Sequence, residues 1–339
     1  MTRRPKRPTL EVVAARAGVS RATASRVLRG STDVSATARD RVLRAAEEVA
    51  YTVNRAARAL VTSRTDSIAF LVAESEERTF HDPYFLGVLR GAQAEAAEAG
   101  VQIVFVIAST VMQTAQFTRF VGGGHVDGVL LVSLHGEDTL VHDLERLGVP
   151  TVVNGRPWDA AAGLFSVDSD NVGGARQATE FLLDRGRRTI TTITGPLDMS
   201  VGQDRLTGYR EALRAAGVDP LADGVREGDF TVEGGAAAMA ALLDAVPDLD
   251  AVFAASDLMA IGAMRALAER GRRVPDDVAV IGFDDVGEAQ LVVPPLTTMR
   301  QPLADLGRMM TRVLLARVTG AEAASRTVLP TEVVRRDSA

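Results

Sequence analysis

Cysteine is absent from the 339 residues of this chain, which excludes disulfide bonds and cysteine-ligated metals and suits a reducing compartment. The N-terminal segment MTRRPKRPTL is basic, but the apolar stretch of a secretory signal does not follow it. No apolar run approaches the length of a membrane-spanning helix. We therefore expect a cytoplasmic protein.

Signatures of catalysis and of metal binding are missing as well. The four histidines lack the spacing of metal ligands, so we interpret His81, His125, His135 and His142 as surface or core residues. The glycine-rich VGGGHVDG lacks the Lys-Ser/Thr pair of a phosphate-binding loop, and no G-x-S-x-G motif or pair of catalytic acids stands out. These absences predict no catalytic residue, no metal and no cofactor, and therefore a protein that is not an enzyme.

What the chain does have is a strong asymmetry of charge. The formal net charge is −6, but residues 1–65 hold 14 Lys and Arg against 5 Asp and Glu, a net charge of +9. The remaining residues hold 24 basic and 39 acidic side chains, a net charge of −15. A small basic segment joined to a larger acidic body indicates that only the small segment meets a polyanion.

Helical periodicity divides the basic segment into short helices. Thr9 can cap a helix over 10–17, which Gly18 ends, and Ser20 can cap a second helix that runs to about residue 28. A third helix follows Ser35 and continues to about residue 50. Two helices joined by a tight turn predict a helix-turn-helix DNA-binding head, which we place at residues 1–53. The basic, alanine-rich residues 54–65 predict one short helix that forms only when it is paired or bound.

From residue 66 the pattern becomes that of an α/β protein. Apolar, β-branched runs such as SIAFLVA, VQIVFVIA and DVAVIGFDD alternate with helical segments, which indicates parallel sheets covered on both faces. The number of strands predicts two doubly wound lobes. We expect the core at 66–330, with the first lobe at about 66–165 plus 296–330 and the second at about 166–295.

These pieces, taken in order, resemble the LacI/GalR family of bacterial transcription regulators, of the lac-repressor and purine-repressor type. The resemblance rests on TLEVVAARAGVSRATASRVLRG, HDPYFLGVLRGAQAEAAEAG, DRLTGYREAL, ASDLMAIGAMRAL, DVAVIGFDD and PPLTTMRQP. It implies a DNA-reading head, a hinge helix, and a core of two periplasmic-binding-protein-like lobes that close on a small molecule. The implied function is that of a transcriptional regulator, most often a repressor, controlled by a sugar or a related metabolite.

The second helix of the head is predicted to lie in the major groove of DNA, with its N-terminal residues facing the base edges. Arg21 can pair with guanine through two hydrogen bonds, whereas Ala22 offers only a methyl contact. The resemblance implies base readout at Arg21, Ala22 and Arg26; the alternative is that the two arginines are solvated or contact only phosphates. The residues of the head that we predict to contact DNA are Thr9, Ser20, Arg21, Ala22, Thr23, Ser25 and Arg26.

The resemblance gives the segment 54–65 the role of a hinge. It implies that Leu60 wedges into the minor groove at the centre of the operator, where an apolar side chain unstacks a base step and bends the duplex. Asn54, Ala57 and Arg58 match other hinge contacts of the family; the alternative is that the segment is only a linker. Because one head reads few base pairs, we expect a homodimer on a palindromic operator. The final TEVVRRDSA carries no leucine heptads of the kind that make a tetramer.

Ligands of open α/β sheets bind at the carboxyl ends of strands, and several polar residues follow predicted strands. The resemblance and these positions together predict effector contacts at Phe85, Asn154, Arg156, Arg205, Phe230, Ser256, Asp257 and Asp284. Arg205 is well suited to hydroxyls or a carboxylate. Asp257 has the alternative role of capping its helix, and Asp170 and Asn171 fit caps better than ligand contacts. Ser256 and Gly155 depart from the side chains usual in the family, which leaves the effector open.

The alternative function is that of a transport-type sugar-binding protein with the same two-lobed core. Such a protein needs an export signal and has no helix-turn-helix, whereas this chain shows the reverse pattern.

Overall fold

The computed structural model describes residues 8–28, 33–51, 64–136, 139–157 and 163–339. The chain divides into two compact units, residues 1–65 and 66–339, which are described separately. Among the helices of the described ranges, none combines the length and the apolar character that a membrane crossing requires.

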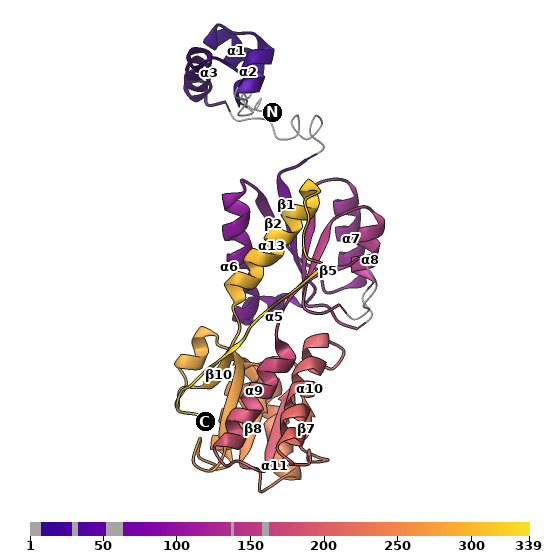
Figure 1. Cartoon of the computed structure of the whole chain (residues 1–339), viewed down its shortest axis with the longest axis vertical. Helices are drawn as coiled ribbons and strands as arrows, with labels where there is room; N and C mark the ends of the chain where they lie inside the picture. The colour runs from indigo at the N-terminus through magenta and orange to yellow at the C-terminus, as the bar shows by residue number, and fades with distance from the viewer. Residues whose placement is uncertain (1–7, 29–32, 52–63, 137–138, 158–162) are drawn as a thin grey trace, which may run out of the picture. The chain divides into compact units, whose positions relative to one another are not determined.

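In its described residues, the first unit is a bundle of three short helices (Figure 1), as expected from the sequence. They are α1 (Leu10–Ala17), α2 (Arg21–Leu28) and α3 (Ala36–Glu48). Gly18 takes a left-handed conformation with φ 62°, which lets the chain turn sharply between α1 and α2. The core of the unit is made of small side chains, mainly alanine and valine, because helices this short must approach closely to exclude water.

The first lobe of the second unit is a sheet in the order β11-β5-β4-β3-β1-β2, in which all neighbours are parallel. The strands are β1 (Ser67–Val72), β2 (Gln102–Ile107), β3 (Val129–Val132), β4 (Thr151–Asn154), β5 (Phe165–Ser169) and β11 (Arg326–Leu329). Two core clusters fill the two faces of the sheet. The helices of this lobe are α5 (Glu76–His81), α6 (Pro83–Glu98), α7 (Val111–Gly122), α8 (Leu140–Arg146) and α13 (Leu303–Thr319), with α6 and α13 side by side (Figure 1).

The second lobe repeats this plan with the sheet order β12-β10-β9-β8-β6-β7, in which only β12 runs antiparallel to its neighbour. The strands are β6 (Ile190–Thr194), β7 (Val225–Glu227), β8 (Ala251–Ala254), β9 (Ala279–Asp284), β10 (Thr297–Arg300) and β12 (Glu332–Val334). The helices are α9 (Asn171–Asp184), α10 (Ser200–Ala215), α11 (Val232–Ala245), α12 (Asp257–Glu269) and the short η1 (Gly287–Gln290). The expected fold class, a helix-turn-helix head and two doubly wound lobes, is therefore confirmed.

The chain crosses between the lobes three times, after β5, after β10 and after β11. These crossings differ from the expected lobe boundaries. β5 completes the first sheet, although the second lobe was expected from residue 166, and β10 joins the second sheet, although 296–330 was expected in the first lobe. The core also continues past residue 330, since β12 is part of the second sheet and Ser338 is fully buried. Both β5 and β10 contain polar residues, so they lack the continuous apolar run that marks strands such as β1 and β9.

Candidate functional site

A cavity of about 570 Å³ lies between the two lobes, where the carboxyl ends of their strands face each other. This volume is that of a typical small-molecule site. The first lobe contributes the segment before and at the start of α6 and the ends of β3 and β4, and the second contributes α10 and the end of β9. The segments that cross between the lobes add Asp168, Asn171 and Gln301. A ligand held here would touch both lobes and the connections between them.

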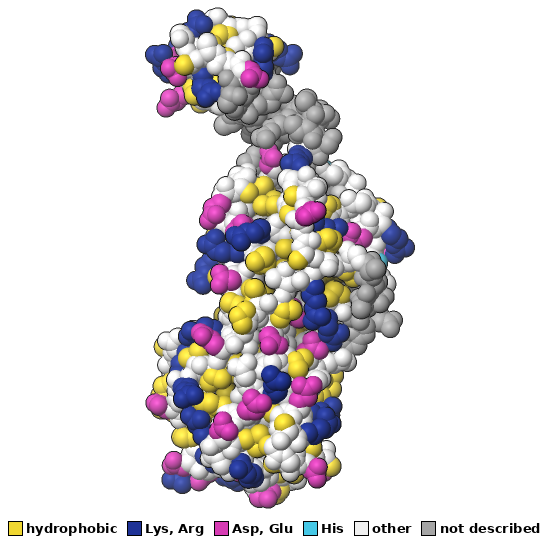
Figure 2. All heavy atoms as spheres, viewed as in Figure 1, with side chains coloured by type: hydrophobic (Ala, Val, Ile, Leu, Met, Phe, Trp, Pro, Cys, Tyr) yellow, Lys and Arg dark blue, Asp and Glu magenta, His cyan; other side chains and the backbone are white. Residues whose placement is uncertain are grey.

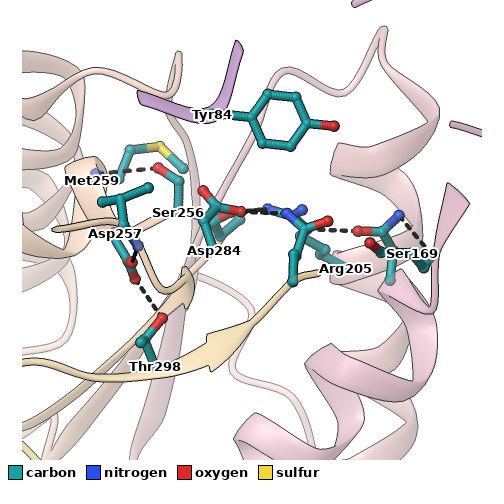
Figure 3. Close-up of polar contacts among 12 residues, drawn as sticks. Tyr84, Ser169, Arg205, Ser256, Asp257, Met259, Asp284 and Thr298 are labelled. Atoms are coloured by element: carbon teal, nitrogen blue, oxygen red, sulfur yellow. Dashed lines mark hydrogen bonds and ion pairs between the residues drawn. The ribbon is translucent and has the colours of Figure 1, made fainter. Parts of the chain in front are cut away.

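Arg205 is a buried cation of this cavity, held by several contacts (Figure 3). Its side chain is almost fully buried, and its guanidinium lies 3.8 Å from the centre of the Phe283 ring. Nε donates a hydrogen bond to Asn171 Oδ1 at 2.9 Å, and Nη1 donates to the backbone carbonyl of Ala255. Nη1 also lies 3.5 Å from Asp284 Oδ1. These contacts hold the guanidinium in one orientation before any ligand arrives, which reduces the entropy lost on binding.

Asp284 faces Arg205 from the end of β9 (Figure 3). Burial raises the pKa of its carboxyl to about 7, although the Arg205 charge and the Gln301 hydrogen bond both oppose this shift. The backbone at Asp284 and Asp285 has positive φ angles of 119° and 58°, a region that non-glycine residues rarely adopt and that often marks functional sites. Near neutral pH this carboxyl can therefore donate or accept a hydrogen bond.

Two further carboxyls line the cavity. Asp168 is buried, and its Oδ1 accepts hydrogen bonds from the Ser169 backbone and from Asn171 Nδ2, both at 2.8 Å. Burial raises the pKa of Asp168 to about 6, with a contribution from the negative charge of Asp204. Burial likewise raises the pKa of Asp82, which caps α6 by accepting a bond from the Tyr84 backbone at 3.0 Å. The cavity thus presents both hydrogen-bond donors and acceptors, as polyhydroxylated ligands require.

Aromatic rings form apolar walls from both lobes. Phe85 of α6 belongs to the first lobe and Phe230, just before α11, to the second. The guanidinium of Arg78 lies 5.6 Å from the centre of the Phe85 ring and 4.9 Å from that of Phe230. Tyr84 packs edge-on against Phe85 and donates a hydrogen bond to Asn154. Flat apolar faces beside polar groups suit the two kinds of surface that a sugar ring offers.

The structure brings six of the eight predicted effector residues together. These cavity-lining residues are Phe85, Asn154, Arg156, Arg205, Phe230 and Asp284. Ser256 and Asp257 do not line the cavity, which corrects the expectation for both. Ser256 caps α12 by accepting a bond from the Met259 backbone at 3.2 Å, and Asp257 accepts bonds from the Val286 backbone at 2.9 Å and from Thr298 (Figure 3).

Several cavity residues were not predicted from the sequence. Asp82 and Tyr84 belong to the HDPYF segment, which is part of the sequence that carries the family resemblance, so this segment could have identified them. Asp168, Asn171 and Gln301 lie on crossings between the lobes, and no local pattern announces such a crossing. The expectation that Asn171 is a cap is wrong: Asp170 caps α9 by accepting a bond from the Gly173 backbone at 2.9 Å, whereas Asn171 orients Arg205.

Four of the five predicted DNA-contacting residues of α2 share its exposed side, whereas Thr23 lies outside it and its hydroxyl contacts that of Ser20 at 2.8 Å. At about 100° per residue, an arc of about 140° of the helix contains Arg21, Ser25, Ala22 and Arg26. This arc lies opposite the buried Ala24 and Val27. Arg21 pairs with Glu11 at 3.0 Å, but both side chains are well exposed, so this pair is weak and readily exchanged for DNA.

The other predicted residues of the head frame the ends of its helices. Ser20 caps α2 by accepting a bond from the Thr23 backbone at 3.1 Å, and Thr9 precedes α1 without a side-chain cap bond. The predicted hinge contacts Asn54, Ala57, Arg58 and Leu60 lie outside the described residues.

Comparison with known proteins shows two family matches. Residues 9–54 match the model of the bacterial regulatory proteins of the lacI family, and residues 179–339 match a periplasmic binding protein-like domain. The transcriptional regulator CelR of Thermobifida fusca is 48% identical over 337 residues, which covers 99% of both chains. The repressor CytR of Escherichia coli K12 is 34% identical and covers 92% of this chain and 90% of its own length.

Solved structures agree over nearly the whole chain. A complex of the regulator CelR with cellobiose matches with a TM-score of 0.80 at 46% identity, covering 98% of this chain and all of the other. A lac repressor dimer bound to its operator and the anti-inducer ONPF matches with a TM-score of 0.85 at 27% identity, covering 98% and 99%.

Proposed function

This chain belongs to the lacI family of bacterial regulatory proteins, and from that premise we propose that it is a repressor whose operator binding is controlled by a sugar held between its lobes. The family consists of DNA-binding transcriptional regulators, so the expectations of a regulator and of a non-enzyme are confirmed. The match of the head to the lacI model disfavours the alternative of a transport-type binding protein.

The observation that carries the sugar proposal is the chemistry of the cavity. Arg205, Asp284 and Asp168 offer donors and acceptors at fixed positions, and Phe85 and Phe230 offer apolar faces. The CelR relative was solved with cellobiose, so a glucose disaccharide is the first ligand to test. For the site residues we therefore retain Phe85, Asn154, Arg156, Arg205, Phe230 and Asp284, and add Tyr84, Asp168 and Asn171.

For DNA binding, we assign residues 1–53 to the reading head, 54–65 to the hinge with Leu60 as its wedge, and the rest to the effector core. Arg21, Ala22 and Arg26 are the proposed base-reading residues, since they lie on the exposed arc of α2. The lac repressor in the operator complex is a dimer, and this core exposes Leu291 and Val293 by 81% and 92%, which fits a surface covered by a second copy. A regulator of this kind acts on the nucleoid in the cytoplasm.

A thermal-shift screen of the full-length protein tests the effector site. We expect cellobiose or a related sugar to raise the melting temperature, since a ligand at 100 times its Kd adds about 2.7 kcal/mol to the free energy of unfolding. Arg205→Lys keeps the positive charge but loses the planar guanidinium, which donates hydrogen bonds to Asn171 and to the Ala255 carbonyl at the same time. Sugar affinity should therefore fall more than about tenfold. Arg210→Lys, an exposed change on the same helix, is the matched control.

The sugar proposal fails if no monosaccharide or disaccharide stabilises the protein, or if only a nucleoside does. The assignment of Arg205 fails separately if Arg205→Lys and Arg210→Lys bind the stabilising ligand with equal affinity.

A further inference from the structure

A histidine joins the two lobes at the edge of the cavity. His135 follows β3 of the first lobe, and its Nε2 lies 2.9 Å from Oε1 of Glu74, which follows β1 of the same lobe. Its Nδ1 lies 3.0 Å from Oδ2 of Asp198, in the loop before α10 of the second lobe. The backbone N–H of Gly136 also donates to the carbonyl of Asp198 at 2.6 Å. The contact between the lobes at this point therefore depends on His135 and its neighbour.

The two carboxylates constrain the protonation of the imidazole. A neutral imidazole has one N–H donor and one lone pair, so a carboxylate at each nitrogen would leave one lone pair facing a negative oxygen. Only the imidazolium form donates to both partners. Hydrogen bonding to Glu74 raises the pKa of His135, with a further contribution from Asp198. The geometry and the electrostatics thus agree that the bridged arrangement favours the protonated form of His135.

Among the described residues, the charged groups around His135 come from the loop after β1, from α5, from α8 and from the loop before α10. Glu74 is buried and also accepts hydrogen bonds from Arg78 of α5 and from Ser133. Burial alone would raise the pKa of Glu74, but its bonds to His135, Arg78 and Ser133 lower it, so it stays negative. Asp143 of α8 lines the same open groove as His135. When the lobes separate, His135 keeps Glu74 within its own lobe and loses Asp198.

A second ion pair between the lobes provides a contrast. Arg156, which follows β4, contacts Asp204 of α10 at 2.8 and 3.2 Å, and Ser200 donates to the Arg156 carbonyl at 2.7 Å. A guanidinium stays charged across the physiological pH range, so this pair does not respond to pH. Within the described residues, the lobes are therefore joined by one permanent ion pair and by one that depends on a proton.

We propose that His135 is a proton-dependent latch between the lobes, which favours the closed cavity when it is protonated. Closure brings Asp198 to an imidazole that otherwise faces Glu74 alone, so the closed form binds the proton more tightly than the open form. By linkage, the latch stabilises closure at low pH, and this stabilisation is lost as pH rises through the titration of His135 in the closed form. The latch acts whatever ligand the cavity takes and does not rest on the proposed sugar.

Lobe closure can be measured directly because the chain has no cysteine that would react with a label. Two exposed glutamates on different lobes, Glu98 of α6 and Glu269 of α12, are changed to cysteine and labelled with a fluorophore pair. We record energy transfer within single full-length molecules from pH 5.5 to 8.5, without sugar. The labelled protein is diluted with unlabelled protein. As pH rises over this range, we expect the ratio of closed to open molecules to decrease by a factor of about three to about ten. A difference of one unit between the His135 pKa in the closed and open forms corresponds to tenfold, and the half-exposed pair should give somewhat less.

Three variants separate the latch from other effects. His135→Gln and Asp198→Asn should each remove the part of the pH dependence that the latch supplies, and the part that comes from Asp168 and Asp284, which titrate in the same range, should remain equal in both variants. Asp198 is exposed, so its change should leave the fold intact. Asp204→Asn should lower the closed fraction at every pH and keep the part of the pH dependence that comes from His135, since it breaks the pair with Arg156. It also removes a negative charge that raises the pKa of Asp168. His125→Gln, an exposed histidine stacked on Phe120, is the control and should change nothing.

Histidine NMR gives an independent readout, because the chain has four histidines. The titration of His135 should move to lower pH in Asp198→Asn and stay in place in Asp204→Asn. The proposal is overturned if the closed fraction does not depend on pH, if the dependence is as steep in both His135→Gln and Asp198→Asn as in the parent chain, or if Asp198→Asn leaves the titration of His135 unmoved.

Discussion

Two buried aspartates of the cavity, Asp168 and Asp284, keep their protons at a higher pH than ordinary aspartates do. Burial is the main cause in both, since a carboxylate in a poorly solvated site loses the water that stabilises its charge. Such groups lower the free energy of unfolding of the ligand-free protein at neutral pH. A bound ligand can supply hydrogen bonds that stabilise them. A polar ligand that stabilises these carboxyls therefore binds more tightly than it would to a cavity whose polar groups were already stabilised.

Replacement of Asp284 by asparagine tests this reading. The pKa of Asp284 is about 7 in the folded chain and 3.8 for an ordinary aspartate, so between these values the folded state binds more protons than the unfolded state. The free energy of unfolding should therefore fall as pH rises from about 4 to 7, by on the order of 3 kcal/mol from this group. The free energy of unfolding of Asp284→Asn, measured by urea denaturation at several pH values, should fall less steeply with pH than that of the parent chain.

Asp219→Asn, at an exposed aspartate, is the control and should keep the slope of the parent chain. A variant slope equal to that of the parent would show that Asp284 is already ionised across this range.

At the scale of elements, pairs of helices approach each other through glycines. A Cβ added to Gly91 of α6 would lie 1.8 Å from the carbonyl oxygen of Ala304 in α13, and one added to Gly307 of α13 would lie 1.9 Å from that of Val88. Glycines lie at the contacts of α9 with α10 and of α11 with α12 as well. Each lobe thus depends on backbones that touch without side chains between them.

Gly91→Ala should consequently destabilise the protein, although alanine is the better helix former by about 1 kcal/mol. The added methyl group has to push α13 away from α6, and we expect a loss of about 3 kcal/mol or more in the free energy of unfolding. Gly122→Ala, at the end of α7, meets only Leu147 Cδ1 at 3.5 Å and should be neutral or stabilising. Urea denaturation of both variants measures the difference, and equal stabilities would contradict the close approach.

At the scale of the whole molecule, charge separates the two tasks. The first 65 residues carry a net charge of +9 and the rest −15, so only the head attracts a polyanion. On the face shown in Figure 2, acidic and basic side chains of the lobes are interspersed, with no broad field of one sign. DNA affinity should come from the head alone and should fall steeply with salt.

Deletion of residues 1–65 tests this division. The remaining unit has its own core clusters and should fold, so a sugar that stabilises the full chain should stabilise the shortened one equally. Its salt-dependent binding to duplex DNA, measured by fluorescence anisotropy, should vanish, whereas the full chain should lose affinity by about 0.9 log units per log unit of salt for each phosphate contacted. Undiminished DNA binding by the shortened chain would contradict the proposal.

The sequence by itself determined the elements whose pattern is local. The three helices of the head follow from apolar residues at helical spacing with Gly18 at the turn, and apolar strands such as β1 and β9 follow from continuous β-branched runs. Asp284 was also predictable, since the end of a strand places a polar side chain at the sheet edge where ligands bind. Arg205 lies in the second turn of α10, which begins at Ser200, and the resemblance rather than its position on the helix pointed to it.

Only the tertiary structure decided which polar residues share the cavity. Asp168, Asn171 and Gln301 reach it because the chain crosses between the lobes beside them, and Asp257 misses it because its carboxylate turns to Val286 and Thr298. The bridge from His135 to Glu74 and Asp198 likewise joins positions 61 and 63 residues apart. Hydrophobic periodicity reports which side of an element is buried, but the partner of a buried or bridging polar group is set by distant segments, and no local pattern encodes that distance.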